Sequence, residues 1–299
     1  MKLSALAFIG SCLFVCFGSA FAQADASLQG LNGKIKTLTE YNYTAIDIAN
    51  FQNKSAYKTV SQYDEQGKKL KQYTYGPDGT LTMKSNFSYD DDGLLLDERD
   101  YDGHGKYLSA DLYKYDRKGN EVSRKHYNPA GLVFLKTSSE YEDMGNLVLE
   151  ETVDADNEPI SKAKWRYDTS GNPTEEAVYD ADETLTRRIT YQYDRKGNLG
   201  AINTTVYGLT LRTIYKYDDS GKKKEEYNYN AEKVLDRKIT FKYDAQGNET
   251  EQNYFSADGR LQKSLTYRNE YDRQGNLVRK IQTGTGKQIV ILRKEIEYY

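Results

Sequence analysis

The stretch GLLLDERDYDGHGKYLSADLYKYDRKG (residues 93–119) decides the fold, because it is one unit of a repeat that fills most of the chain. Each unit ends in the phrase Tyr-(Asp/Glu)-x-x-Gly, which occurs nine times, and six of the eight spacings between its copies are 26 residues. The copies begin at Tyr63, Tyr89, Tyr115, Tyr141, Tyr167, Tyr193, Tyr217, Tyr243 and Tyr271. A fixed period of this length is typical of repeat architectures.

Each unit contains two segments with the length of β-strands, here residues 94–101 and 106–115, and a polar turn follows each one. The aspartate that opens a turn can accept a bond from the backbone two residues on. Glycine three residues later supplies the left-handed residue of a type I turn closed by a G1 bulge. Asn157, Glu183 and Lys233 replace that glycine in three of the weaker phrases between the major ones. Since Glu and Lys seldom adopt positive φ, their two turns are expected to differ.

The longer segment of each unit alternates with period two, which indicates a half-buried strand. Aromatic residues stand two positions before most major tyrosines, with a polar residue between them. These aromatic residues are Phe87, Tyr113, Trp165, Tyr191, Tyr215 and Phe241, with Ser61, Ser139 and Asn269 as exceptions. The sequence therefore predicts an all-β protein: an elongated, twisted antiparallel β-meander or solenoid of about nine 26-residue two-strand repeats, with a thin tyrosine-rich core.

The chain divides into four parts. Residues 1–22 carry one early lysine, a short apolar run and a small-x-small ending, the pattern of a secretory signal peptide. Residues 23–62 form a degraded N-terminal repeat or cap, and residues 63–285 form the repeat array. Residues 286–299 contain a strand expected to cap the C-terminal end, because solenoids need atypical terminal units. The mature protein is thus expected in the periplasm, on the outer surface or secreted.

Composition excludes several classes of function. Both cysteines, Cys12 and Cys16, fall in the signal peptide, so the mature chain has no disulfide and no thiolate nucleophile. Removing Lys2 with the signal takes the formal charge from −3 to −4, with both signs interspersed. Nucleic-acid binding requires a clustered basic stripe, which the chain lacks. No second long apolar run follows the signal, so no membrane span is expected in the mature chain.

The repeated phrase resembles the YD repeats of the RHS class. The resemblance rests on YDRKGN at 115–120, YDRKGN at 193–198 and YDRQGNL at 271–277, and it covers about residues 60–285. The ending EIEYY (295–299) is also similar to that of uncharacterised secreted YD-repeat proteins from Bacteroidetes-like bacteria. The resemblance implies a β-repeat fold in an extracytoplasmic setting. Large RHS proteins use such repeats as a shell around a C-terminal toxin, but this chain ends on a repeat strand and lacks a proline-rich autoproteolytic motif.

Catalytic and metal-binding patterns are weak. His104 in a turn and His126 in a strand match no metal or triad spacing. The acidic turns at 90–92 and 154–156 do not continue into an EF-hand loop, and turn capping explains them better than calcium. We therefore expect a protein that is not an enzyme and has no metal and no cofactor, although an envelope hydrolase using two nearby carboxylates stays open.

Binding is the activity that the aromatic repeat favours. Same-type residues recur on every second strand, roughly 9.5 Å apart, a spacing suited to stacking the sugar rings of an extended polysaccharide. The candidate ligand-binding residues are Tyr115, Trp165, Tyr167, Tyr191, Tyr193, Tyr217 and Tyr243. The alternative for each is a half-buried core residue with a wet hydroxyl. The expected function is an exported interaction scaffold of the cell envelope for a protein or polysaccharide. The alternative is an RHS-toxin-related shell, or an immunity or accessory protein.

Overall fold

A computed structural model describes residues 30–45, 56–284 and 289–299. The predicted signal peptide lies outside these residues. The described chain forms twenty strands in one antiparallel sheet, each paired with the next along the chain. The first ten are β1 (Ile35–Ala45), β2 (Tyr57–Tyr63), β3 (Lys69–Tyr75), β4 (Leu81–Tyr89), β5 (Leu95–Asp102), β6 (Tyr107–Tyr115), β7 (Glu121–Tyr127), β8 (Val133–Tyr141), β9 (Leu147–Asp154) and β10 (Pro159–Tyr167). The others are β11 (Pro173–Asp180), β12 (Leu185–Tyr193), β13 (Leu199–Val206), β14 (Leu209–Tyr217), β15 (Lys223–Tyr229), β16 (Leu235–Tyr243), β17 (Glu249–Ser256), β18 (Leu261–Tyr271), β19 (Leu277–Gly284) and β20 (Ile289–Tyr298).

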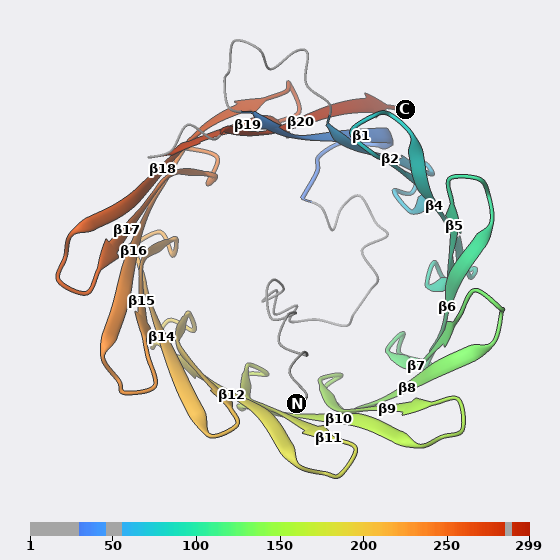
Figure 1. The fold of residues 1–299 in the computed structure, drawn as a ribbon, viewed down its shortest axis with the longest axis horizontal. Coiled ribbons are helices and arrows are strands. Elements are labelled where there is room, and N and C mark those ends of the chain that lie inside the picture. Colours follow the sequence, from blue (N-terminus) through green and yellow to red (C-terminus); the bar gives the residue numbers. More distant parts are fainter. Residues whose placement is uncertain (1–29, 46–55, 285–288) are drawn as a thin grey trace, which may run out of the picture.

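The sheet closes into a barrel, because β1 and β20 pair with each other over ten register positions (Figure 1). The all-β prediction is confirmed, whereas the prediction of an open meander or solenoid is wrong. The solenoid prediction places the first and last strands in separate caps at opposite ends. In the structure these strands, β1 and β20, pair with each other and form the seam of the barrel. Closure removes both sheet edges, so every strand has two hydrogen-bonded neighbours.

The seam between the two ends of the described chain is held by more than backbone pairing. The hydroxyl of Tyr299 donates to the carbonyl of Tyr63 at 2.6 Å, and Lys36 pairs with Glu297 at 2.9 Å. Asn276, only 1% exposed, accepts the backbone N–H of Asn32 at 2.6 Å. These contacts join β1, β2, β19 and β20 into one continuous wall.

Regular bulges accompany the closure. The pairing register shifts one residue before each major tyrosine, as between Lys114 and Tyr115, and again at the weaker phrases, as between Asp100 and Tyr101. Bulges increase local twist and bend a strand, and they concentrate at the rims of barrels. The pairing of β13 with β14 has no such shift, but the other units have one at each end, and the bend accumulates along the sheet until the first and last strands meet.

The turns have the predicted chemistry. In the turn after β6, the carboxylate of Asp116 accepts the backbone N–H groups of Lys118 at 2.8 Å and Asn120 at 2.9 Å. Gly119, with φ of 85°, donates its N–H to the Asp116 carbonyl at 3.1 Å, and the N–H of Asp116 bonds the Asn120 carbonyl at 2.9 Å. The type I turn with a G1 bulge is confirmed.

The turns without glycine do not differ, contrary to the prediction from their sequences. Glu183 and Lys233 adopt φ of 59° and 61° and donate to the carbonyls of Asp180 and Asn230 at 3.1 and 3.0 Å, as the glycines do. The repeated hairpin geometry on both sides of each turn imposes the left-handed conformation, which costs a residue with a Cβ roughly 1–2 kcal/mol.

We therefore expect Glu183→Gly and Lys233→Gly each to raise the free energy of unfolding by about 1 kcal/mol, measured by urea denaturation. The matched control is Gly197→Ala. A Cβ at that position would meet nothing within 4 Å, but its φ is +84°, so this change should destabilise the protein through backbone conformation alone. Equal stability of all three variants and the wild type would contradict the argument.

The two faces of the wall differ, and the more buried face points inward. Direct register pairing places Leu38, Ser61 and Gln72 on one face, which continues around the sheet through Ser85 and Phe87. Leu31 packs against the Leu38 side of the wall. Figure 1 shows residues 30–34 running inside the ring to the start of β1, so this face is the lumenal one.

Twenty strands spaced about 4.8 Å apart and tilted by roughly 40° make a ring about 40 Å across between backbones. Barrels of about 16–18 strands already enclose more space than inward side chains can fill. The wall therefore surrounds a wide lumen. The side chains on its inner face are the groups that a molecule inside the lumen would contact.

Candidate functional site

The candidate site is a belt of side chains around the lumenal face at one height of the barrel. Seven even-numbered strands, from β4 to β16, each contribute one residue, and each of these pairs directly with one residue of the next strand. The pairs are Phe87–Glu98, Tyr113–Arg124, Ser139–Glu150, Trp165–Glu176, Tyr191–Ile202, Tyr215–Glu226 and Phe241–Gln252. We call these fourteen residues the lumenal belt. It presents aromatic rings that mostly alternate with polar or charged groups around the described wall.

A second aromatic row borders the belt and has a structural role. In this row, the hydroxyl of each tyrosine donates to the backbone carbonyl of the first residue of the preceding strand, at 2.7–3.0 Å. We call these seven bonds the tyrosine rungs. They join Tyr89 to Lys69, Tyr115 to Leu95, Tyr141 to Glu121, Tyr167 to Leu147, Tyr193 to Pro173, Tyr217 to Leu199 and Tyr243 to Lys223. Burial raises the pKa values of Tyr115, Tyr167, Tyr193 and Tyr243 to about 12, so these hydroxyls stay protonated as donors.

The seven residues predicted to bind ligand therefore fall into two groups on the same face. Tyr115, Tyr167, Tyr193, Tyr217 and Tyr243 belong to the tyrosine rungs, and all five are half-buried. Trp165 and Tyr191 belong to the lumenal belt, where Trp165 is half-buried and Tyr191 is 6% exposed. Their role in binding stays a prediction. Trp165 is the member best placed to offer a ring face, because no hydroxyl ties it to the wall.

The carboxylates of the belt are the polar groups that the sequence prediction missed. Glu176 pairs with Arg187 at 2.5 Å. Among the described residues, Glu98 and Glu150 make no hydrogen bond or ion pair, and both are half-buried. Burial raises the pKa of both carboxyl groups, in the case of Glu98 to about 7. The sequence contains a pattern that could have revealed these carboxylates, because a glutamate occupies the same position of the shorter strand in four repeats. These residues are Glu98, Glu150, Glu176 and Glu226.

Around Glu98 the belt becomes a cluster of ionisable groups. Glu98 faces Asp111 in register, and Asp111 faces His126, whose Nδ1 lies 2.5 Å from the Asp111 carboxylate. Asp100 is bonded by the hydroxyls of Ser85 at 2.5 Å and Ser109 at 3.1 Å. The Cβ atoms of directly paired residues lie about 4.5–5.5 Å apart, so the carboxyl groups of Glu98 and Asp111 can approach the separation of about 5–5.5 Å found in retaining glycosidases. The geometry thus brings together a protonatable acid and a carboxylate, which keeps the hydrolase alternative open.

This cluster predicts a pH dependence of stability. The pKa of Glu98 is raised by burial first, and then by the charges of Asp100 and Asp111. A carboxyl whose folded pKa exceeds its unfolded value stabilises the fold below the unfolded pKa, and this stability is lost as pH rises towards about 7. We expect wild-type stability in urea to fall between about pH 4.5 and 7.5, and Glu98→Gln to flatten that fall. Glu270→Gln, on the outer face, is the control; an unchanged slope in Glu98→Gln would contradict the assignment.

The described part of the chain brings no three His, Cys, Asp or Glu side chains together as a potential metal site. In the same residues, no helix has the length and apolarity needed to cross a membrane. The acidic turns at 90–92 and 154–156 bond their own backbones, since the carboxylates of Asp90 and Asp154 accept N–H groups of Leu94 at 2.8 Å and Glu158 at 2.9 Å.

Comparison with known proteins does not assign a family. No protein-family profile and no curated protein matches the sequence. Among solved structures, the chain is similar to a TcdB2–TccC3–Cdc42 complex (16% identity, TM-score 0.34), with 80% of this chain aligned to 15% of that one. It is also similar to porin-like proteins from Bacteroides uniformis (11% identity, TM-score 0.39, 89% of this chain and 98% of that one) and Bacteroides vulgatus (13%, 0.28, 90% and 99%). The chain spans only a small part of the toxin component, and all three TM-scores lie below the level of a shared fold.

Proposed function

We propose that this protein is a non-enzymatic ring scaffold of the cell envelope, which surrounds an extended polysaccharide and binds it against the lumenal belt. The observation that carries the proposal is the pairing of β1 with β20, since it closes the barrel and makes the repeated aromatic row face an enclosed lumen. The secretory signature of residues 1–22 supports a location outside the cytoplasm.

The chemistry of the belt suits sugars. An aromatic ring can stack on the apolar face of a sugar, and a carboxylate beside it can accept the sugar's hydroxyl groups. Trp165 with Glu176 provides both groups at adjacent positions, and Glu150 lies one strand away, across from Ala163. Glu150 has no hydrogen-bond partner among the described residues, so a ligand hydroxyl could satisfy it without breaking a bond of the wall.

The outer face supports a ring surrounded by water. Oppositely charged residues pair across neighbouring strands, as in Lys162–Glu151 at 2.9 Å and Lys242–Glu251 at 3.0 Å. A barrel that faces lipid needs a continuous apolar outer band. Charged groups at mid-strand on this face are therefore better suited to an aqueous compartment.

The test is a glycan-array and peptidoglycan pull-down with purified residues 23–299. Trp165→Ala should weaken binding at least tenfold, since it removes a stacking platform. Lys164 precedes Trp165 on the same strand, but its side chain lies on the outer face. The Lys164→Ala variant should therefore bind like the wild type. Both variants must first show the wild-type circular dichroism spectrum and remain folded at the temperature of the assay. Failure of the wild type to retain any glycan would overturn the polysaccharide proposal.

A second function is favoured by the closure itself. A closed wall can enclose a polypeptide, as the resemblance to RHS shells implies. Under this alternative, the same pull-down retains no glycan but recovers a defined envelope or secreted protein. That protein should protect lumenal positions that are only half-buried, such as a cysteine at Ser161, from thiol reagents, while an exposed outer position such as Ser138 stays reactive.

A further inference from the structure

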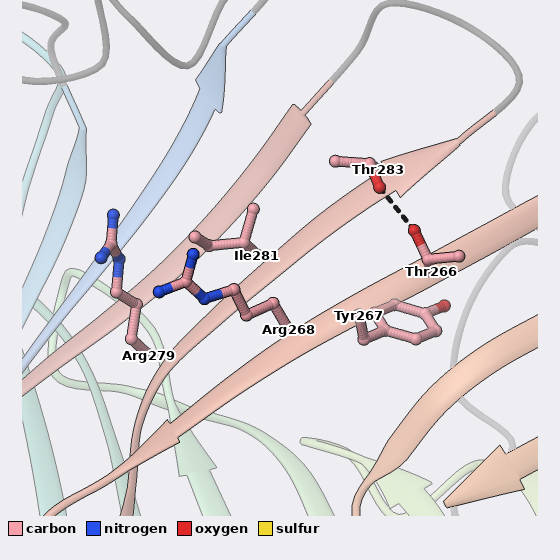
Figure 2. Close-up of a pocket in the computed structure, with 6 residues that line it drawn as sticks. All are labelled: Thr266, Tyr267, Arg268, Arg279, Ile281 and Thr283. Atoms are coloured by element: carbon pink, nitrogen blue, oxygen red, sulfur yellow. Dashed lines mark hydrogen bonds between the residues drawn. The ribbon is translucent and has the colours of Figure 1, made fainter.

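A second hollow lies on the wall between β18 and β19, and nothing in the function proposed above uses it (Figure 2). Its volume is about 420 Å³, and it is lined by Thr266, Tyr267, Arg268, Arg279, Ile281 and Thr283. This volume falls within the range of roughly 300–1,000 Å³ typical of small-molecule sites.

The hollow opens on the outer face. Arg268 and Ile281 are direct register partners, as are Thr266 and Thr283, so these four side chains share one face. Tyr267 lies between Thr266 and Arg268, and its hydroxyl reaches the lumenal side, where it donates to Gln252 at 2.9 Å. The hydroxyl of Tyr267 is therefore directed away from the outer face, although the residue itself borders the hollow.

Where the structure describes the side chains around the hollow, positive groups outnumber negative ones. Arg268 and Arg279 share one carboxylate, that of Glu270, at 3.1 and 3.4 Å. Arg279 also stands directly opposite Arg293 on β20, whose own partner is Glu295 at 2.6 Å. Like charges in direct register destabilise a sheet. Among the described residues, three guanidinium groups thus meet two carboxylates, and an added anion would relieve this excess.

Hydrogen-bond donors and an apolar surface complete the hollow. The hydroxyl oxygens of Thr266 and Thr283 lie 2.5 Å apart, and Figure 2 shows them bonded at its upper end. One hydroxyl proton makes that bond, which leaves the proton of the other hydroxyl able to donate to a ligand. Ile281 is 7% exposed and gives the hollow an apolar side.

We infer that this hollow binds an organic anion, with its carboxylate or phosphate group between Arg268 and Arg279 and its body against Ile281. Guanidinium groups bind both oxyanions through paired N–H donors. The hollow is larger than a bare phosphate ion requires, and Ile281 offers that ion no partner. The site therefore suits a small acid with an apolar or ring-shaped body. This inference is independent of the lumenal function, since the residues lie on opposite faces.

The test is titration calorimetry of purified residues 23–299 with three probes: phenyl phosphate, benzoate and phenol. We expect saturable binding of at least one of the two anions and none of neutral phenol. Arg268→Gln and Arg279→Gln should each weaken that binding at least tenfold. Arg268 is 76% exposed, so its replacement should leave the fold intact even if Arg279→Gln is less stable. Binding of both anions would identify a general oxyanion site, whereas binding of one would identify the preferred group.

Arg188→Gln is the matched control. Arg188 is an outer-face arginine that approaches a carboxylate, Glu175, across a neighbouring strand at 3.8 Å, but it lies on β12, far from the hollow along the wall. Its variant should bind as the wild type does. Absence of saturable binding, binding of phenol equal to that of the anions, or equal weakening in Arg188→Gln and Arg268→Gln would each overturn the inference.

Discussion

Replacement of Leu38 by aspartate is expected to abolish the closed ring. Leu38 on β1 is 0% exposed, and it pairs with Ser61 on β2 and with Ile296 on β20. It packs in a cluster with Ile35 and Tyr63. Loss of a buried leucine costs about 2–5 kcal/mol, and an unpaired buried carboxylate adds several more. Since whole domains are stable by about 5–15 kcal/mol, we expect a fall of about 5 kcal/mol or more in the free energy of unfolding.

Urea denaturation followed by circular dichroism measures this effect. Asn42→Asp, at an exposed position on the same strand, introduces the same side chain and should change stability by less than about 0.5 kcal/mol. If Leu38→Asp unfolds at the same urea concentration as Asn42→Asp, the seam is not part of the cooperative fold.

The second large effect is expected at the tyrosine rungs. Tyr167→Phe should lower the free energy of unfolding by about 1 kcal/mol, because it removes the 2.7 Å bond to the Leu147 carbonyl and leaves that carbonyl half-buried. Tyr167→Ala should lower it by about 3–5 kcal/mol, because the ring is lost as well. The difference between the two variants separates the hydroxyl bond from the packing of the ring.

Tyr57, which is 63% exposed, provides the control, and Tyr57→Ala should change stability by less than about 0.5 kcal/mol. Successive rungs lie about 10 Å apart, so their effects should add. A triple Tyr115→Phe, Tyr167→Phe, Tyr217→Phe variant should therefore lose about 3 kcal/mol. Stability equal to that of the wild type would show that the hydroxyl bonds contribute nothing.

These rungs also affect how binding experiments are interpreted. A tyrosine variant that loses both its ligand and its fold says nothing about recognition. Trp165 avoids this difficulty, because its ring is predicted to stack on a ligand but has no hydroxyl that bonds to the wall. Glu150 offers a second position of this kind, since it lacks a partner among the described residues and its replacement by glutamine preserves its size.

The sequence allowed the local structure to be predicted, because strands and turns depend on neighbouring residues. The alternation before Tyr115 gives the strand, and the Asp116–Gly119 phrase gives the turn. The prediction failed at Glu183 and Lys233, where the flanking hairpins override the preference of a single residue. It also missed the tyrosine rungs, although their offset of 20 residues from tyrosine to carbonyl recurs along the chain and could have been found as a second period.

Closure could not be predicted, because no local pattern determines it. Whether twenty strands complete one ring depends on the bend per strand summed around the sheet, and a small change per strand leaves the ends apart. The pairing of Thr39 with Glu295 joins residues from opposite ends of the sequence, and neither residue has an unusual pattern around it. The lumenal belt depended on closure, so its inward direction could not be predicted either.

A disulfide across the seam tests the closed ring most directly. The mature chain has no cysteine of its own, so Thr39→Cys with Glu295→Cys introduces one pair at directly facing positions of β1 and β20. Facing residues of antiparallel strands have Cα atoms about 4.5–5.5 Å apart, within the range that a disulfide spans. The control pair, Thr39→Cys with Glu175→Cys on β11, joins opposite sides of the ring (Figure 1).

Mild oxidation of dilute protein, followed by thiol counting and a non-reducing gel, gives the result. The closed ring predicts that the seam pair forms an intramolecular disulfide in most molecules, while the control pair keeps its free thiols. Free thiols in the seam pair, or disulfides formed only between molecules, would show that the ends are apart and would contradict the closed barrel.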